Sequence, residues 1–227
     1  MGQTATKSDP GRDCPACPRL AAFRHDNRAA EPGWHNAPVD SWVSAAGDDD
    51  VELLIVGLAP GLKGANRTGR PFTGDYAGDL LYATLCKYGL AHGSYEARPD
   101  DTLALTRCAI TNAVRCVPPQ NKPTGPEINE CRPYLKRTIE RFENLSAIVT
   151  LGRIAHDSTM RALGIRSASA PFGHGASHVI GGYHIISSYH CSRYNTNTGR
   201  LTPAMFEAVF AEATGHLGAA GGVASHG

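Results

Sequence analysis

The sequence has almost no net charge, no long apolar run and no apolar segment near its start. Its 22 basic and 21 acidic residues leave a formal charge of +1 over 227 residues, so any contact with nucleic acid must come from local clusters of Arg and Lys. No stretch approaches the roughly eighteen apolar residues of a membrane helix, and the opening residues MGQTATKSDPGRD lack the apolar core of a secretory signal. These absences predict a soluble, cytoplasmic protein that does not contact a membrane.

The cysteines do not form the pattern of a disulfide framework, because their number, seven, is odd and no secretory signal precedes them. Cys14 and Cys17 form a C-x-x-C pair. Cys116 stands beside prolines in RCVPPQNKP, and Cys131 opens the helical stretch ECRPYLKR. Together they indicate a four-thiolate site, which is typical of both iron–sulfur clusters and structural zinc. Two further cysteines are predicted to be small core residues: Cys86 and Cys108.

Apolar and β-branched runs alternate with helical patterns along the chain. The strands are expected at residues 51–56, 106–114, 145–151 and 183–188, and the helices at 19–27, 77–88, 126–142, 152–163 and 203–214. This alternation predicts an α/β fold, a three-layer sandwich with a central, mostly parallel four-stranded sheet flanked by helices. One domain is expected over residues 13–214, with a disordered start (1–12) and a disordered tail (215–227).

A long irregular loop, GLAPGLKGANRTGRPFTGD, follows the first expected strand and covers residues 57–75. Its five glycines and two prolines exclude a helical or strand period, and glycines let a backbone approach a ligand closely. Phe72 offers a flat face, and Asp75 is the only acidic side chain of the segment. The sequence therefore predicts a functional loop mounted on a buried strand.

Three unusual segments are expected at one edge of the sheet, because ligands bind beyond the carboxyl ends of parallel strands. They are the loop 57–75, Asn112 at the end of the second strand, and the His190 loop. Phe72 can stack on a planar ring, Asn112 presents a donor and an acceptor in one plane, and His190 can donate to a developing anion. That set suits a nucleobase. In the alternative interpretation Asn112 and His190 are only satisfied polar residues at strand ends.

Four motifs in chain order resemble the uracil-DNA glycosylase superfamily. They are GLAPG at 57–61, GANRTGRPFTGD at 64–75, TNAVRC with PPQNKP at 111–123, and H-x-S-x-x-N followed by TGRLTP at 190–203. The long opening motif with its final Asp is most similar to family 5, the type b enzymes of bacteria and archaea that carry an iron–sulfur cluster. The resemblance spans residues 14–210. One departure is Cys191, where the superfamily usually has a proline that stiffens the loop.

The resemblance implies a role for each residue at the expected site. Phe72 would stack on a flipped base, Asn112 would read its edge, and His190 would stabilise the uracil anion. Many relatives place Asp or Asn just before the first-motif proline to hold water, but here that residue is Ala59. Asp75 is then the best remaining carboxylate to orient water or to stabilise the sugar cation. Capping of the following helix is the alternative role for Asp75.

The resemblance also assigns residues to the base pocket, to DNA and to a metal cluster. The substrate-binding set is Gly57, Ala59, Gly61, Phe72 and Asn195. The DNA-contacting set is Arg67, Arg70, Ser192, Arg193, Tyr194 and Arg200, with Tyr194 or Arg193 filling the stack that the flipped base leaves. A [4Fe–4S] cluster, in preference to zinc, would be held by Cys14, Cys17, Cys116 and Cys131.

These implications describe a monofunctional, monomeric DNA glycosylase that hydrolyses the N-glycosidic bond of uracil in DNA to begin base excision repair. The resemblance to family 5 extends the expected substrates to other deaminated bases such as hypoxanthine and xanthine. No motif supplies a lysine nucleophile, so strand cleavage is not expected. Two alternatives stay open: a non-catalytic iron–sulfur or zinc protein that binds nucleic acid, and a member that cross-links to uracil-DNA through His190.

Overall fold

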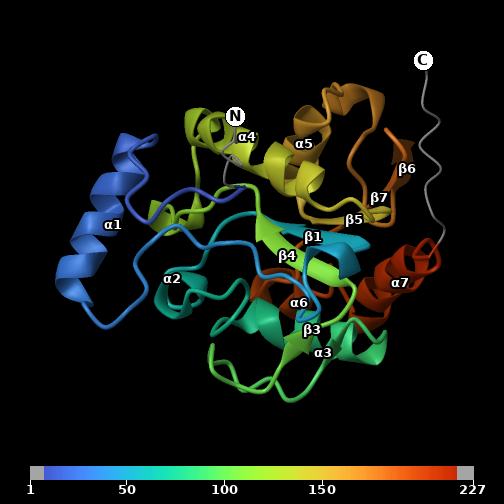
Figure 1. Cartoon of the computed structure of the whole chain (residues 1–227), viewed down its shortest axis with the longest axis horizontal. Coiled ribbons are helices and arrows are strands. Elements are labelled where there is room, and N and C mark those ends of the chain that lie inside the picture. Colours follow the sequence, from blue (N-terminus) through green and yellow to red (C-terminus); the bar gives the residue numbers. More distant parts are fainter. Residues whose placement is uncertain (1–7, 219–227) are drawn as a thin grey trace, which may run out of the picture.

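The computed structural model describes residues 8–218, in which a five-stranded sheet lies between two layers of helices (Figure 1). The helices are α1 (Pro18–Ala30), α2 (Ala65–Thr68), α3 (Tyr76–Lys87), α4 (Gly125–Arg141), α5 (Arg153–Ala162), α6 (Arg193–Asn197) and α7 (Pro203–Thr214). The strands are β1 (Leu53–Gly57), β2 (Ala91–His92), β3 (Ala104–Leu105), β4 (Cys108–Asn112), β5 (Ala147–Leu151), β6 (Ser177–Ile180) and β7 (Tyr183–Ser188). The predicted three-layer α/β fold is confirmed.

The main sheet has the strand order β4-β1-β5-β7-β6, and β2 pairs with β3 in a separate two-stranded ribbon. The four predicted strands all pair in parallel, β1 with both β4 and β5, and β5 with β7. The fifth strand, β6, runs antiparallel to β7 and corrects the expected four-stranded sheet. It escaped prediction because an edge strand with exposed and half-buried residues, SHVI, carries no buried apolar run.

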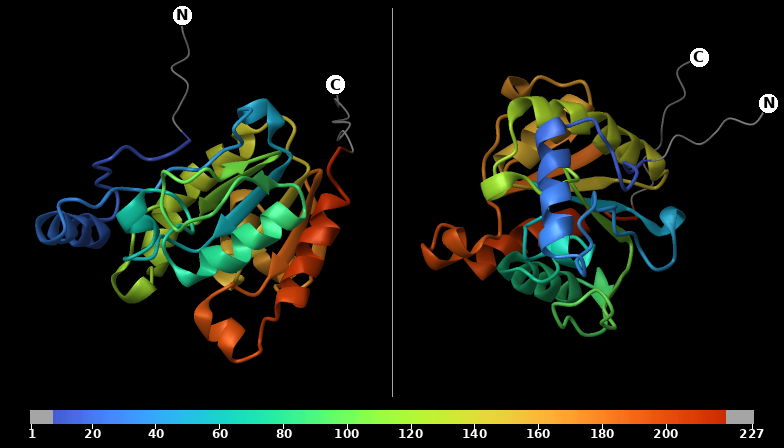
Figure 2. Two further views of the ribbon diagram at one scale, coloured as in Figure 1. Left: turned by 90° about the horizontal axis from the view of Figure 1, so that it is seen from below. Right: turned by 90° about the vertical axis from the view of Figure 1, so that its left-hand side faces the viewer.

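Strand β1 shows how the sequence builds two apolar layers. Leu53 and Ile55 belong to the core that includes residues of α3 and α7, whereas Leu54 and Val56 belong to the core that includes residues of α4 and α5 (Figure 2). Successive strand side chains point to opposite faces, so a run that is apolar at every position is buried on both sides. Because both faces are covered by helices, the carboxyl edge of the parallel strands is the open place for a site.

Capping residues mark the starts of α7 and α4. Thr202 accepts a hydrogen bond from the backbone N–H of Met205 at 3.2 Å and begins α7, with Pro203 in the first turn. Thr124 and Glu127 form a capping box at the start of α4. The short helix α6 lies in a segment that the sequence predicts to be loop, because its five polar residues have no apolar period.

The two ends of the described chain are more ordered than expected. Asp9 lies 2.6 Å from the guanidinium of Arg115, whose side chain is fully buried, and it accepts hydrogen bonds from Ser41. This corrects the expected disorder for residues 8–12, since a buried cation requires a carboxylate partner. Gly218 donates its backbone N–H to the Glu52 carboxylate, so the first residues of the tail, 215–218, are also more ordered than expected. The remaining segments expected to be disordered, 1–7 and 219–227, lie outside the described residues.

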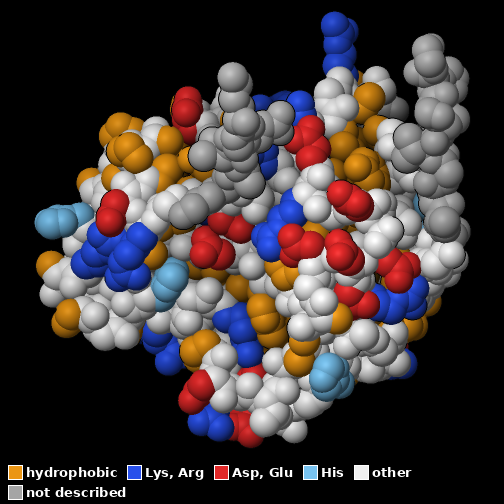
Figure 3. Space-filling view, in the orientation of Figure 1, with side chains coloured by type: hydrophobic (Ala, Val, Ile, Leu, Met, Phe, Trp, Pro, Cys, Tyr) orange, Lys and Arg blue, Asp and Glu red, His pale blue; other side chains and the backbone are white. Residues whose placement is uncertain are grey.

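Charges of both signs alternate on the face shown in Figure 3, where acidic and basic side chains lie beside one another. This agrees with the net charge of +1 and with ion pairs such as Arg107 with Glu52 at 2.6 Å. Within residues 8–218, no helix combines the length and the apolar character that crossing a membrane requires.

Candidate active site

A cavity of about 650 Å³ opens at the carboxyl edge of the sheet. Gly57 ends β1 and pairs in register with Asn112, the last residue of β4, and His190 follows β7 by two residues. The predicted convergence is therefore observed. The residues that line the cavity are Leu58, Ala59, Pro60, Gly61, Leu62, Lys63, Gly64, Ala65, Phe72, Asp75, Tyr76, Ala77, Asn112, Asn121, His190, Ser192 and Arg193.

Phe72 and His190 form two sides of the cavity. Their ring centroids are 6.0 Å apart with an interplanar angle of 27°, and Phe72 is only 6% exposed. Gly57 makes this arrangement possible, because a Cβ at that position would lie 2.6 Å from Cζ of Phe72 and 2.4 Å from Oδ1 of Asn112. No L side chain fits there, which explains a glycine at the end of a strand that is otherwise apolar.

Asn112 is buried at the end of β4 with its side chain in the cavity wall. Its amide makes no hydrogen bond to another side chain or backbone group within residues 8–218. This does not support the alternative in which Asn112 is only a satisfied polar residue at a strand end. A buried amide without an internal partner is suited to receive one from a ligand.

Burial lowers the pKa of His190 to about 4, so the imidazole is neutral at pH 7. The backbone carbonyl of His190 accepts a hydrogen bond from Nδ2 of Asn195 at 2.8 Å. Asn195 was expected to bind substrate, but it does not line the cavity. The formation of α6 turns its amide onto the His190 carbonyl, and the structure makes Asn195 a support of the His190 loop.

Asp75 occupies the N-cap position of α3 without a capping hydrogen bond from its side chain. Burial raises the pKa of Asp75, and the N–H groups of Ala77 and Gly78 offset that effect in part. Its Oδ1 is buried without a hydrogen-bond partner among the described residues. The N–H groups of Ala77 and Gly78 still act on the carboxylate from the start of α3, so its position suits both a cap of the helix and a group of the cavity, which Asp75 lines.

The glycine-rich loop surrounds the Asp75 carboxylate closely. A Cβ at Gly64 would lie 2.5 Å from Oδ2 of Asp75, and one at Gly61 would lie 3.0 Å from it. The glycines of the motif therefore give the carboxylate room, and Gly61 lines the cavity as expected for its place in the substrate-binding set. Ala59 also lines the cavity, where it presents only a methyl group.

Tyr76 and Asn121 are polar cavity residues that the sequence analysis did not single out. Tyr76 is 37% exposed, and the guanidinium of Arg193 lies 5.1 Å from its ring centre at the cavity wall. Asn121 is the fourth residue of the PPQNKP motif and has a positive φ of 56°. The position of Tyr76 directly after Asp75, and the place of Asn121 in a quoted motif, are the signals that point to them in the sequence.

Of the residues assigned to DNA, all but Arg70 lie exposed or at the start of α6. Arg67, Arg193 and Arg200 are exposed, and Arg200 stacks on Tyr189 at 4.5 Å. Ser192 caps α6, and Tyr194 on that helix is 72% exposed.

Arg70 is removed from the predicted DNA contacts. It is 7% exposed, forms two hydrogen bonds to Asp101 at 2.7 and 2.8 Å, and lies over the ring of Trp42 at 4.6 Å. A guanidinium with these partners is not available to a phosphate. Its position in a loop on the active edge did not reveal the buried carboxylate, because Asp101 lies 31 residues further along the chain.

The four cysteines of the predicted metal site line one small cavity between α1, α4 and the loop after β4. Arg24 of α1 donates to Sγ of Cys116 at 3.6 Å, and the backbone N–H of Arg115 donates to Sγ of Cys131 at 3.3 Å. Burial raises the pKa of the Cys17 thiol to about 11 and that of the Cys116 thiol to about 12. Among residues 8–218, no three His, Cys, Asp or Glu side chains are arranged to hold a single metal ion.

The other cysteines are not part of this group. Cys108 is buried as predicted, whereas Cys86 is exposed on the outer side of α3, which corrects its expected place in the core. Cys191, at the position of the usual proline, is fully buried, and its thiol donates to the carbonyl of Ala77 at 3.5 Å. The loop that lacks proline is therefore held by packing.

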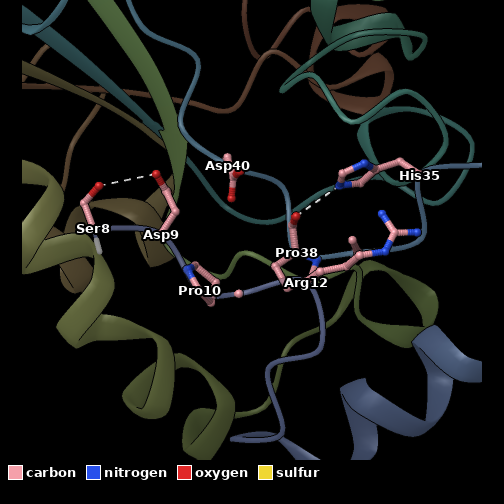
Figure 4. A pocket seen from close by; sticks show the side chains of 9 residues that line it. Ser8, Asp9, Pro10, Arg12, His35, Pro38 and Asp40 are labelled. Atoms are coloured by element: carbon pink, nitrogen blue, oxygen red, sulfur yellow. Dashed lines mark hydrogen bonds between the residues drawn. The ribbon is translucent and has the colours of Figure 1, made fainter. Parts of the chain in front are cut away.

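A second cavity, of about 500 Å³, lies between residues 8–12 and 35–40 (Figure 4). Asp9 and Asp40 carry the acidic groups in its wall, and Arg12 and His35 carry the basic ones. It contains none of the residues that the motifs single out. The cavity at the sheet edge is therefore the candidate active site.

The fold and the site define an α/β protein with a cavity for a planar heterocycle, built from an aromatic ring, an amide, a neutral imidazole and a carboxylate. The model of the uracil DNA glycosylase superfamily matches residues 45–214. A type-5 uracil-DNA glycosylase of Thermus thermophilus is 44% identical over 207 residues, covering 88% of this chain and 92% of the relative. The chain therefore belongs to the uracil-DNA glycosylase superfamily, and within it to the type-5 family.

Two further relatives support this assignment. A type-5 uracil-DNA glycosylase of Pyrobaculum aerophilum is 35% identical over 91% of this chain and 90% of the relative. A type-4 uracil-DNA glycosylase of Archaeoglobus fulgidus is 36% identical over only 51% of this chain and 50% of the relative. The similarity to type-5 relatives thus extends over nearly the whole chain, whereas this type-4 similarity covers half of it.

Proposed function

We propose that the protein is a monofunctional uracil-DNA glycosylase that hydrolyses the bond between uracil and deoxyribose in DNA and so begins base excision repair. The observation that carries this proposal is the convergence of Phe72, Asn112, His190 and Asp75 on one cavity. Each supplies a different requirement of the reaction, and the family to which the chain belongs supports the same conclusion.

The base enters the cavity after rotating out of the DNA stack, which costs a few kcal/mol and least at a mispair. Phe72 stacks on the ring, and the free amide of Asn112 offers a donor and an acceptor to the pyrimidine edge. As the glycosidic bond breaks, its electron pair moves onto the base. The neutral His190 imidazole donates a hydrogen bond to the oxygen on which the charge gathers.

The other product of bond breakage is a sugar cation that water must capture at C1′. Asp75 is the carboxylate of the cavity that orients this water and opposes the positive charge. Because burial raises its pKa, the carboxylate is a stronger proton acceptor than an exposed aspartate. The water adds its oxygen to C1′ and passes a proton to Asp75, leaving an abasic site and free uracil.

The range of bases is proposed to include hypoxanthine and xanthine. Ala59 presents a methyl group where many relatives have a polar side chain, and the cavity volume of about 650 Å³ leaves room for a purine. Both features reduce selection against a larger deaminated base.

The contact with DNA is proposed to involve α6 and the exposed arginines around the cavity. Arg67 and Arg200 are placed to neutralise phosphates, and Ser192 to position the loop in the minor groove. Tyr194 is the better candidate for the side chain that fills the vacated stack, since it is 72% exposed. Arg193 instead contacts Tyr76 at the cavity.

Duplexes with a single uracil, hypoxanthine or xanthine, or with no lesion, test the activity. After incubation with the protein, alkali should cleave the strand at the modified position only. Binding without base release would instead indicate a non-catalytic nucleic-acid-binding protein. A DNA adduct that resists denaturant would indicate covalent retention through His190, and strand cleavage before alkali would contradict a monofunctional enzyme.

We further propose that Cys14, Cys17, Cys116 and Cys131 hold a [4Fe–4S] cluster. Four thiols that line one cavity match the donor set of such a cluster. Hydrogen bonds from Arg24 and from the Arg115 backbone are suited to stabilise ligating sulfurs. Four thiolates also suit structural zinc, and the resemblance to the iron–sulfur enzymes of family 5 favours the cluster. When bound, the cluster would brace α1 and α4 around the loop that follows Asn112.

Absorbance near 400 nm, with iron and acid-labile sulfide assays on the purified protein, tests the cluster. Stoichiometric zinc with no visible band would contradict it.

Size-exclusion chromatography with light scattering tests the further proposal that the enzyme is a monomer, and cell fractionation tests its proposed cytoplasmic location.

A further inference from the structure

The backbone of the turn that carries Phe72 is strained. Phe72 has φ of +52°, in the left-handed region that bulky side chains rarely adopt. Such a conformation costs on the order of 1–3 kcal/mol and persists only when the surrounding structure determines it. The ring of Phe72 nevertheless lies in the cavity wall. The groups that hold this turn therefore determine where the ring stands.

Tyr95 bridges the two sides of the turn with one hydroxyl group. It donates a hydrogen bond to the carbonyl of Phe72 at 3.3 Å and accepts one from the N–H of Gly74 at 3.2 Å. Helix α3 approaches closely at Gly78, where a Cβ would lie 2.0 Å from the Phe72 carbonyl oxygen and 2.5 Å from Oη of Tyr95. A glycine at this helix position leaves room for both groups.

A buried ion pair holds the turn from its other side. Nε of Arg70 donates to Oγ1 of Thr73 at 2.7 Å, and its two terminal nitrogens bind Asp101. Asp101 also accepts from the backbone N–H groups of Glu96 and Leu103, at 2.9 and 3.1 Å. The loop between β2 and β3 thereby brings both Tyr95 and Asp101 to the turn.

We propose that Tyr95 and the Arg70–Asp101 pair are positioning residues that hold the strained turn, so that the Phe72 ring forms the platform on which the flipped base stacks. None of the three lines the base cavity, and they act through Phe72. The inference rests on the proposed excision of a flipped base and extends it to residues outside the quoted motifs, Tyr95 and Asp101. The β2–β3 loop becomes part of the active-site support.

A double-mutant cycle tests this role by single-turnover excision of uracil from a duplex. Tyr95→Phe removes only the hydroxyl and should slow excision about five- to tenfold, the loss expected for one or two hydrogen bonds. In the Phe72→Ala background, Tyr95→Phe should slow excision no further, because no ring remains to be positioned. A full additional loss in that background, or a single variant with the wild-type rate, would overturn the inference.

Binding separates positioning of the base from general damage to the fold. Tyr95→Phe should bind a duplex that already contains an abasic site as tightly as the wild type within about twofold, because that duplex has no base to stack on Phe72. The matched control is Tyr88→Phe, at the far end of α3, which should leave the excision rate unchanged. Weaker binding of the abasic duplex by Tyr95→Phe would contradict the assigned role.

Arg70→Lys perturbs the turn from its other side and covers the case in which Tyr95→Phe does not fold. Lysine keeps the charge but cannot form the bidentate pair with Asp101. Arg70→Lys should therefore slow excision in the otherwise wild-type protein and not in the Phe72→Ala variant. Equal slowing in both backgrounds would refute positioning through Phe72. A wild-type enzyme that releases no uracil would refute the proposed function itself, whereas wild-type activity with no effect of either variant would refute only this inference.

Discussion

His190 illustrates how burial selects one chemical form of a residue. Its lowered pKa of about 4 keeps the ring neutral over the physiological range, so it donates a hydrogen bond without bringing a full charge into the cavity. A neutral donor interacts most strongly with the base once charge has moved onto it. In the proposed mechanism, the imidazole thus favours the transition state over the bound substrate.

Replacing His190 by alanine should slow uracil excision on the order of a hundredfold or more, because one well-placed donor to an oxyanion contributes about 3 kcal/mol to lowering the barrier. Single-turnover kinetics with saturating enzyme measure this loss. A loss of less than about threefold would place the stabilisation of the anion elsewhere. Since the neutral ring is the active form, the wild-type rate should not fall between pH 5.5 and 7.5 through loss of an imidazolium proton.

Asp75→Asn should also slow excision on the order of a hundredfold, within the range for a positioned acid or base, while folding normally because Asn is an equally good N-cap residue. Burial raises the pKa of Asp75 above the ordinary value of 3.8. The wild-type rate should therefore fall on acidification at a higher pH than an ordinary aspartate would give. A pH profile of both proteins is the check, and an unchanged rate in a folded Asp75→Asn protein would exclude the assigned role.

At the scale of elements, the segment Arg193–Asn197, predicted as loop, forms the helix α6, which carries side chains proposed to contact DNA. Ser192 caps it, Asn195 ties it to the His190 carbonyl, and Tyr194 projects from it. A five-residue helix is marginal alone, so its position depends on these contacts with the neighbouring chain. The hydrogen bond from Asn195 therefore couples the position of α6 to that of His190.

Tyr194→Ala should weaken binding of a uracil duplex by about 1–3 kcal/mol, the range for stacking of one aromatic side chain on a base. Fluorescence anisotropy at fixed salt measures the affinity. Val179→Ala is the matched control, because Val179 is 68% exposed but lies on the edge strand β6. An effect of equal size at both positions would show that Tyr194 has no special role in DNA binding.

At the scale of the whole molecule, the fully buried Arg115 connects distant segments of the chain. Arg115 lies in the loop that follows β4. Its guanidinium binds Asp9, Ser41 and Thr138. Asp9→Ala should destabilise the protein by about 3–5 kcal/mol, because it leaves a buried guanidinium without its carboxylate. Urea unfolding at pH 7 measures the change.

The control for that experiment is Asp13→Ala, which breaks the Arg28–Asp13 pair. That pair has a similar distance of 2.6 Å but an exposed carboxylate, so its loss should cost less than about 1 kcal/mol. Equal effects of the two substitutions would contradict the special role of the buried pair.

The charge distribution of the whole molecule leads to a test with salt. A net charge of +1 provides no general attraction to DNA, so binding must depend on a few local arginines. The affinity for a uracil duplex should fall steeply between about 50 and 200 mM salt as phosphate contacts release counterions. Arg67→Ala should make that slope shallower by about one phosphate contact. A flat salt response of the wild type would argue against the proposed DNA surface.

The sequence by itself determined the alternation of strands and helices and the motifs at the carboxyl edge. Runs such as residues 53–56 are buried on both faces, and glycine, proline and threonine mark the helix ends, so these features depend on local chemistry. The same local patterns predict Phe72, Asn112 and His190 at one edge of the sheet. They fail for β6, whose residues carry no apolar run, and for Cys86, whose helix turns it outward.

Only the tertiary structure decided which polar groups have partners. Arg67 and Arg70 are both basic residues of one loop, yet Arg67 is exposed whereas Arg70 is buried against Asp101, 31 residues away. In the part of the chain that the structure describes, the buried amide of Asn112 has no hydrogen-bond partner. These side-chain contacts join segments that are far apart in the sequence, and the periodicity of a short stretch contains no information about them. Spatial packing therefore separates the residues that face the substrate from those that hold them in place.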